Sequence, residues 1–253
     1  MAENDESTFK KLRIFNAIMG GVHLVQVFLV LQLSNNFSLP VTYTVPEYDA
    51  ITNSITPVSK ELFSLEIGPL VALFLLISAG AHILIATALY DRYKKNLKKH
   101  MNPFRWYEYS ISASLMIVII AMLTSIYDFG TLVALFTLTA VMNLCGLIME
   151  IHNQTTEKTN WVSYIVGCIA GFIPWVVIFI PLIAAESVPD FVVYIFISIA
   201  IFFNCFAVNM VLQYKKIGKW SNYYHGEMVY IILSLVAKSL LAWQVFAGTL
   251  RPA

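Results

Sequence analysis

Residues 231–248 read IILSLVAKSLLAWQVFAG and contain one charged side chain, Lys238. No other charged residue lies within ten positions on either side of this lysine. About 20 predominantly apolar residues are enough to cross the hydrocarbon core of a bilayer as an α-helix. The segment therefore predicts a membrane-spanning helix with a lysine near its middle.

The rest of the chain has the same apolar character. Of its 253 residues, 58% are hydrophobic and 12% are charged, and the mean hydropathy is +0.72. A soluble domain carries about 25% charged residues, whereas lipid favours helices because they satisfy their own backbone hydrogen bonds. The composition predicts an all-α membrane protein, with residues 1–253 forming a single domain of seven transmembrane helices. The spans are expected at residues 14–33, 67–90, 103–127, 131–151, 161–185, 191–214 and 226–249.

One long connection, residues 34–62, separates the first two expected spans. It contains the β-branched and aromatic run Val41–Val45, and Pro40, Pro46 and Pro57 interrupt any helical pattern. This composition favours a short β-hairpin in the first extracellular loop. The alternative is a disordered loop.

The basic residues are distributed unevenly between the two membrane sides. Placing the N-terminus in the cytoplasm puts 13 of the 16 Lys and Arg residues on the inner side and only Lys60 and Arg251 on the outer side. Cytoplasmic loops are enriched in Lys and Arg. We therefore expect a multi-pass protein of the plasma membrane, surrounded by the lipid bilayer, with a cytoplasmic N-terminus and an extracellular C-terminus. A net charge of +1 gives no reason to expect a nucleic-acid partner.

Lys238 requires an explanation because a charged lysine at the centre of a membrane helix costs roughly 2.5–3.5 kcal/mol on insertion scales. A desolvated amine is a good nucleophile toward an aldehyde, so a Schiff base would explain its position. The alternative is a neutral lysine that lines a water-filled cavity.

Glu108, in the third expected span, is the candidate partner of this amine. It lies in the stretch NPFRWYEYSISAS, with Arg105 three residues before it and Ser112 four residues after it, so the three share one helical face. A carboxylate near a protonated Schiff base stabilises the charged form, by about 4 kcal/mol at 4 Å and an effective dielectric constant near 20. The alternative is that Glu108 only pairs with Arg105 at the membrane interface.

Further polar residues are expected on the cytoplasmic side of Lys238. Glu227 and Ser234 precede it by eleven and four residues and lie on the same helical face, and His23 and His82 fall in the inner halves of their spans. These histidines are either hydrogen-bonded packing residues or part of an internal polar cavity. Glu150, at the inner end of the fourth span, is expected at the interface. Outward of Lys238 the helix continues with apolar residues: Leu241, Ala242 and Val245.

The motifs VAKSLLAWQ (236–244) and RWYEYS (105–110), together with the inside N-terminus, resemble those of the heliorhodopsins, an inverted branch of the microbial rhodopsins. The resemblance covers essentially the whole chain. It implies a rhodopsin-like bundle, a homodimer, all-trans retinal on Lys238, and Glu108 as counterion. It also implies that Ser112 and Ser234 lie near the Schiff base, that Phe206 lies near the retinal chain, and that the inner polar cavity is lined by His23, His82, Arg105 and Glu227.

Two departures from the proton pumps bear on function. Bacteriorhodopsin-type pumps carry an acid one turn before the retinal lysine and another three turns after the counterion, where this chain has Ser234 and Ile119. We therefore expect a photosensory receptor that signals to an unknown cytoplasmic partner without net ion pumping. The alternatives are a light-driven or light-gated ion transporter or channel and, least favoured, a zinc hydrolase. Such an enzyme needs three or four metal ligands, and we expect neither a metal site nor enzymatic activity.

Overall fold

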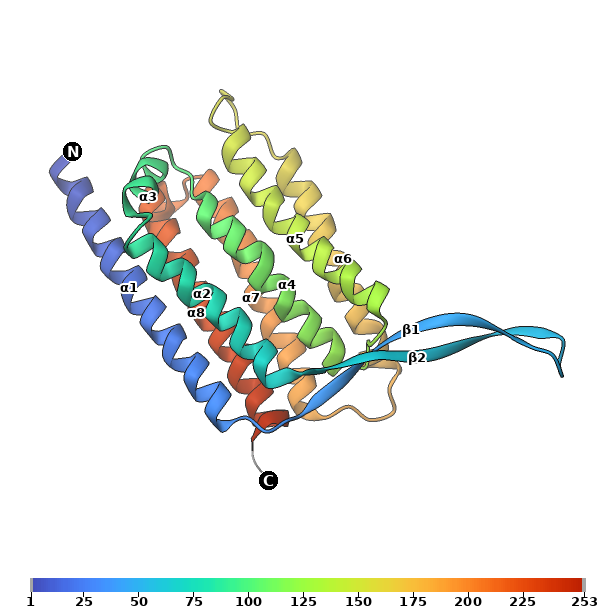
Figure 1. The fold of residues 1–253 in the computed structure, drawn as a ribbon. Helices are drawn as coiled ribbons and strands as arrows, with labels where there is room; N and C mark the ends of the chain where they lie inside the picture. The colour runs from blue at the N-terminus through green and yellow to red at the C-terminus, as the bar shows by residue number, and fades with distance from the viewer. Residues whose placement is uncertain (1, 252–253) are drawn as a thin grey trace.

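A computed structural model describes residues 2–251 of the chain, and a bundle of seven long helices dominates it (Figure 1). Each of the seven is long and apolar enough to cross a membrane, which confirms the predicted fold class. Their bounds are Ala2–Leu33 (α1), Ile67–Ala86 (α2), Pro103–Leu123 (α4), Phe129–His152 (α5), Val162–Ala184 (α6), Asp190–Tyr214 (α7) and Tyr223–Val245 (α8).

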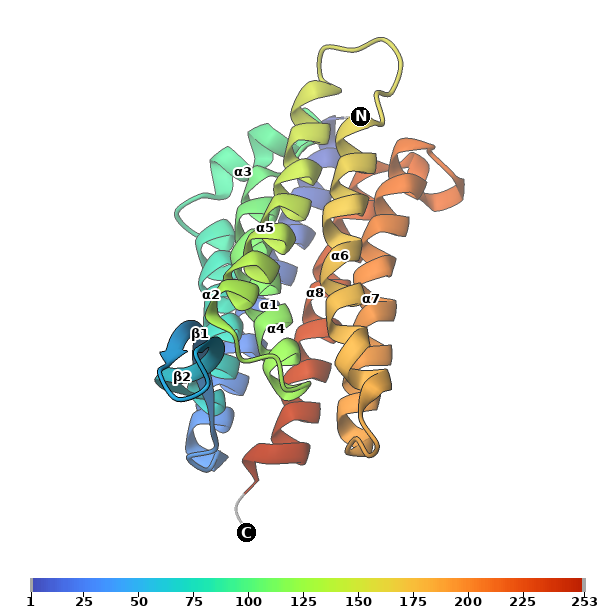
Figure 2. The ribbon, with the colours of Figure 1, turned by 90° about the vertical axis from the view of Figure 1, so that its right-hand side faces the viewer.

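The two ends of the bundle differ in what they carry (Figures 1 and 2). The N-terminus and a short helix, α3 (Tyr90–Leu97), lie at one end, called here the α3 end. The C-terminus and a β-hairpin lie at the opposite end, called here the hairpin end. Each long helix packs mainly against the long helices next to it in the sequence, except that α6 and α7 have little contact with each other.

Polar residues fix where several helices begin. The side chain of Asn102 caps α4 by accepting a hydrogen bond from the backbone N–H of Arg105, and Pro103 occupies the first turn. Asp128 caps α5 through the N–H of Thr131 at 2.8 Å. These caps satisfy backbone donors that have no partner within the helix.

The predicted hairpin is confirmed and consists of the antiparallel strands Ser38–Asp49 (β1) and Ser54–Glu66 (β2). Both strands are edges, so proline is tolerated, and Pro46 pairs with Pro57. The hairpin is anchored to the bundle where the N–H of Thr42 donates to the carbonyl of Tyr127 at 2.8 Å. From there it extends sideways beyond the helices (Figure 1).

Several predicted span ends differ from the observed helix ends, and two of them have a local physical reason. The second helix ends at Ala86 instead of residue 90, and the separate helix α3 follows, because residues 91–99 are too polar for the bilayer. Tyr93 and Leu97 lie one helical turn apart and are buried, so they hold α3 against the bundle. The third span ends at Leu123 instead of 127, where Ser125 adopts a left-handed backbone conformation with φ of 66°.

The hairpin-end half of the bundle is packed with apolar side chains. Its core includes Val30, Val71, Ile120, Leu241 and Val245, all fully buried. The buried acids and bases lie elsewhere, around the middle of the bundle and toward the α3 end. This asymmetry determines where the polar chemistry of the protein can occur.

Candidate functional site

The buried amine of Lys238, on α8, forms an ion pair with Glu108 on α4. Lys238 Nζ donates to Glu108 Oε1 at 2.7 Å and to Ser234 Oγ at 3.0 Å. Lys238 is 3% exposed and Glu108 is 9% exposed. Because each group compensates the charge of the other, both can remain buried without an unpaired charge.

The Glu108 carboxylate is held from a second helix as well. Ser78 Oγ, on α2, donates to the same Oε1 atom at 2.7 Å. The ring of Tyr109 lies 5.0 Å from Lys238 Nζ, close enough for a cation–π interaction. Ser112 is fully buried, and its hydroxyl lies near enough to the Glu108 carboxylate to interact with it.

Two apolar cavities meet beside Lys238. A small one of about 40 Å³ touches Lys238, Ser234 and Tyr109, and a larger one of about 640 Å³ extends along α5, α6 and α7. Four residues line both: Met142, Asn143, Phe203 and Phe206. Trp106 lines the larger cavity. Its ring lies so close to Gly146 that a Cβ atom at position 146 would be only 2.5 Å from the ring. The cavities form an aromatic, apolar space that begins at the amine.

His23 and His82 lie together toward the α3 end. Their rings stack with centroids 5.8 Å apart, and His82 Nδ1 contacts Asn16 Oδ1 at 2.7 Å. Both ring nitrogens of His23 are buried without a partner among the described residues. The structure thus brings these two histidines together.

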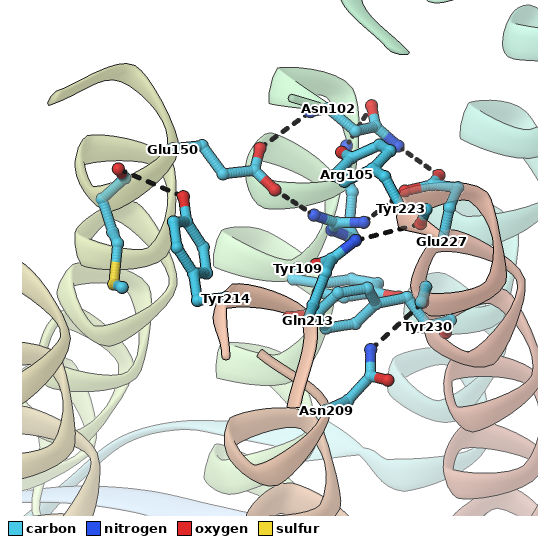
Figure 3. A network of polar contacts seen from close by, with 12 residues as sticks. Asn102, Arg105, Tyr109, Glu150, Asn209, Gln213, Tyr214, Tyr223, Glu227 and Tyr230 are labelled. Carbon is cyan, nitrogen blue, oxygen red and sulfur yellow. Dashed lines mark hydrogen bonds and ion pairs between the residues drawn. The ribbon is translucent and has the colours of Figure 1, made fainter. Parts of the chain in front are cut away.

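Arg105 and Glu227 belong to a different group, the Arg105 cluster, which comprises Arg105, Glu150 and Glu227 (Figure 3). The guanidinium of Arg105 bridges Glu150 on α5 and Glu227 on α8, and both acids are 1% exposed. Glu150 is therefore not interfacial as predicted, since it turns inward to Arg105. The alternative pairing of Glu108 with Arg105 was also wrong, because each residue has a partner on another helix.

Residues that the sequence did not single out connect the two groups. Tyr93 Oη donates to Glu227 Oε1 at 3.0 Å, and a side-chain hydrogen bond links Tyr93 with Asn16. Asn102 Nδ2 also donates to Glu227 Oε1, at 2.7 Å. The only sequence feature that could have identified Asn102 is its position before Pro103, which is typical of a helix N-cap. A continuous set of polar contacts thus extends from His82 to Arg105.

The fold and site together define a class: a seven-helix membrane protein whose seventh span carries a lysine paired with a carboxylate beside an apolar cavity. Residues 12–250 match the heliorhodopsin family model, so the chain belongs to the heliorhodopsin family. Heliorhodopsins are retinal-binding microbial rhodopsins, and the chain is a multi-pass membrane protein. Comparison with curated proteins gives no match.

The residues around Lys238 suit retinal. The amine is the group that reacts with an aldehyde, the carboxylate of Glu108 compensates a positive charge on it, and the adjoining cavities are lined by apolar and aromatic side chains. A cavity of about 640 Å³ also falls within the usual size range of small-molecule sites. Among the residues that the structure describes, no group of three or more potential metal ligands occurs.

Proposed function

We propose that this protein is a light sensor in which Lys238 binds all-trans retinal as a protonated Schiff base and Glu108 is the counterion. The observation that carries the proposal is the buried contact of 2.7 Å between Lys238 Nζ and Glu108 Oε1, next to an apolar cavity. Bound retinal supplies visible-light absorption and a light-driven change of shape. The protein supplies the attachment point, the compensating charge and the cavity.

Each residue around the amine has a distinct role in this proposal. Glu108 keeps the proton on Lys238 Nζ, Ser234 accepts a hydrogen bond from the same nitrogen, and Ser78 orients the carboxylate. Ser112 lies one turn from Glu108, and its hydroxyl interacts with the carboxylate, which supports its proposed position near the Schiff base. Phe206 lines both cavities and packs edge-on against Tyr109, which supports its proposed position beside the polyene.

The asymmetry of the bundle supports sensing over ion transport. A proton leaving Lys238 toward the α3 end meets Glu108, His82, Tyr93 and Glu227. Toward the hairpin end, the buried polar residues of the described chain, such as Thr124, carry no ionisable group. A complete transport path needs exchangeable groups on both sides of the amine.

The α3 end is proposed as the cytoplasmic side. Basic residues concentrate there, including Arg92, Lys95, Lys99 and Lys216, all exposed, as the positive-inside rule requires. A cytoplasmic signalling partner and a homodimer also remain part of the proposal. Size-exclusion chromatography with light scattering in detergent measures the oligomeric state directly.

The proposal is tested by the visible spectrum of protein purified with all-trans retinal. We expect a pigment in the wild type and none in Lys238→Ala. Glu108→Gln should keep a pigment that absorbs further to the red, because removing the negative charge near Nζ destabilises the ground state more than the excited state. Glu150→Gln is the matched control, since Glu150 pairs with Arg105, and its shift should be much smaller. A pigment that survives Lys238→Ala excludes the proposed attachment.

Light-induced pH change in a cell suspension distinguishes a sensor from a pump. We expect no sustained change that an uncoupler abolishes. A sustained, uncoupler-sensitive change would establish the transport alternative instead.

A further inference from the structure

The connection between α2 and α4, residues 87–102, is tied to the bundle interior through two carboxylates. Glu227 Oε1 accepts hydrogen bonds from Tyr93 Oη at 3.0 Å and from Asn102 Nδ2 at 2.7 Å. Glu150 Oε2 accepts one from the backbone N–H of Asn102 at 2.7 Å. Glu150 and Glu227 are called here the carboxylate pair. A segment at the α3 end is thus held by the same acids that hold Arg105.

The carboxylate pair has more negative charge than its surroundings compensate. Arg105 is the cation between the two acids, so the Arg105 cluster carries one formal negative charge when both acids are ionised. The other titratable groups facing it are phenols, which are neutral at physiological pH: Tyr93 on α3, Tyr109 on α4, Tyr214 on α7, and Tyr223 and Tyr230 on α8. One additional proton would make this buried cluster neutral, so the cluster can accept a proton.

Tyr93 acts as a hydrogen-bond donor to this pair and not as a second acid. Burial and the nearby Glu227 carboxylate raise the pKa of Tyr93 well above its ordinary value. Its hydroxyl therefore keeps its proton, and the hydrogen bond to Glu227 is strong because the acceptor is charged. Neutralising Glu227 would weaken this bond and the one from Asn102 together.

Polar side chains lead from the amine of Lys238 toward this cluster. Glu108 contacts Lys238 and Ser78, and Ser78 lies one helical turn from His82 on α2. From His82 the contacts continue through Asn16 and Tyr93 to Glu227. The Arg105 cluster is the last buried charged group on this route before the surface of the α3 end.

Apart from these bonds, the segment is held by apolar packing of Tyr93 and Leu97 and by ring contacts of Tyr90, Lys98 and His100. In α3, only Tyr93 and Leu97 are buried. Its exposed side carries Arg92 and Lys95, and Lys98 and Lys99 follow it. Like charges at this spacing destabilise the helix that carries them, so weaker bonds to the carboxylate pair would favour unwinding of α3.

We propose that the carboxylate pair takes up the proton that light displaces from Lys238, and that this protonation releases residues 87–102. The inference rests on the proposed function. The N–H bond on the Lys238 nitrogen breaks and leaves its electron pair on nitrogen, and an O–H bond forms on Glu150 or Glu227. The number of protons in the protein is unchanged, so this switch requires no net transport.

Hydrogen–deuterium exchange of the full-length protein tests the release. In the dark, Glu227→Gln should raise amide exchange in residues 87–102 about tenfold or more, because hydrogen bonds to a charged acceptor become bonds to a neutral one. Illumination should raise exchange in the same residues of the wild type and add little in Glu227→Gln. Glu157→Gln, an exposed acid at the same end of the bundle, is the matched control and should behave as the wild type.

A second variant and a second measurement cover poor folding of Glu227→Gln. Tyr93→Phe keeps the buried ring and removes only the hydroxyl, so it should keep the pigment and increase exchange in residues 87–102 in the dark. Infrared difference spectra should show a carboxylic-acid band on illumination that is absent or shifted in Glu150→Gln or Glu227→Gln. A band that is unchanged in both variants, or dark exchange that neither Glu227→Gln nor Tyr93→Phe alters, would overturn the inference.

The outcomes separate the two proposals. Protein that never forms a pigment refutes the proposed function, although the dark comparison of Glu227→Gln with wild type still decides whether the carboxylate pair holds residues 87–102. Protein that is pigmented and light-responsive but shows no light-dependent exchange in this segment refutes only the proton-operated release.

Discussion

Replacing Arg105 by methionine should strongly destabilise the protein, because it removes the cation between two buried acids. Glu150 and Glu227 are both 1% exposed, and Arg105 bridges them. Removing one partner of a buried ion pair typically costs about 3–5 kcal/mol, since the remaining charge has neither water nor a counter-charge. Here one substitution breaks two such pairs, which places the cost toward the upper end.

The assay is thermal unfolding of the purified protein in detergent. For a chain of this size, 1 kcal/mol corresponds to about 2–4 °C in Tm, so Arg105→Met, at a cost of about 5 kcal/mol, should lower the Tm by roughly 10–20 °C. Arg92→Met removes an exposed arginine from α3 and serves as the control. Its Tm should change by no more than a degree or two.

A triple variant tests whether charge is the cause. Arg105→Met combined with Glu150→Gln and Glu227→Gln contains no buried charge in the cluster, while methionine and glutamine keep the side chains near their original size. It should recover at least half of the decrease in Tm seen in Arg105→Met, because replacing a whole buried ion cluster by uncharged side chains of similar volume can preserve stability. If the triple variant unfolds at the same temperature as Arg105→Met, lost packing and not uncompensated charge explains the effect, and the reasoning fails.

Two further predictions concern single contacts. Burial and the nearby charge of Lys216 lower the pKa of His100. Protonation of His100 therefore disfavours the folded state as the pH falls through the ordinary histidine range. Lys216→Gln should raise the pKa of His100, which an NMR titration of this residue measures. Gly146→Ala should cost about 1–3 kcal/mol because its Cβ would lie 2.5 Å from the Trp106 ring; its Tm should fall, whereas Gly80→Ala, with no atom within 4 Å, should be neutral or stabilising.

The sequence predicted the features that depend on local composition. Seven apolar segments define the helices because length and hydropathy determine what can cross a bilayer. Lys238 and Glu108 were recognisable because a charged residue in an apolar segment requires a partner, and the structure pairs them. The hairpin followed from a β-branched run interrupted by prolines.

The partners of Arg105 could not be predicted in the same way. Periodicity shows which residues share a face of one helix, and it placed Arg105 beside Glu108. It does not fix how α5 and α8 rotate relative to α4, and this rotation brings Glu150 and Glu227 to the guanidinium. Helix α3 was missed for another reason: eight polar-rich residues give no signal in a search for apolar spans.

The position of the buried charges explains why one end of the bundle is suited to carry a signal. A charge that moves from Lys238 toward the hairpin end enters packed apolar side chains such as Leu241 and Val245, where a charged group is costly. Toward the α3 end it meets groups that can share it, and the last of these also hold residues 87–102. The same asymmetry that opposes transport across the membrane therefore directs the effect of light to a segment at the surface, where a partner can detect it.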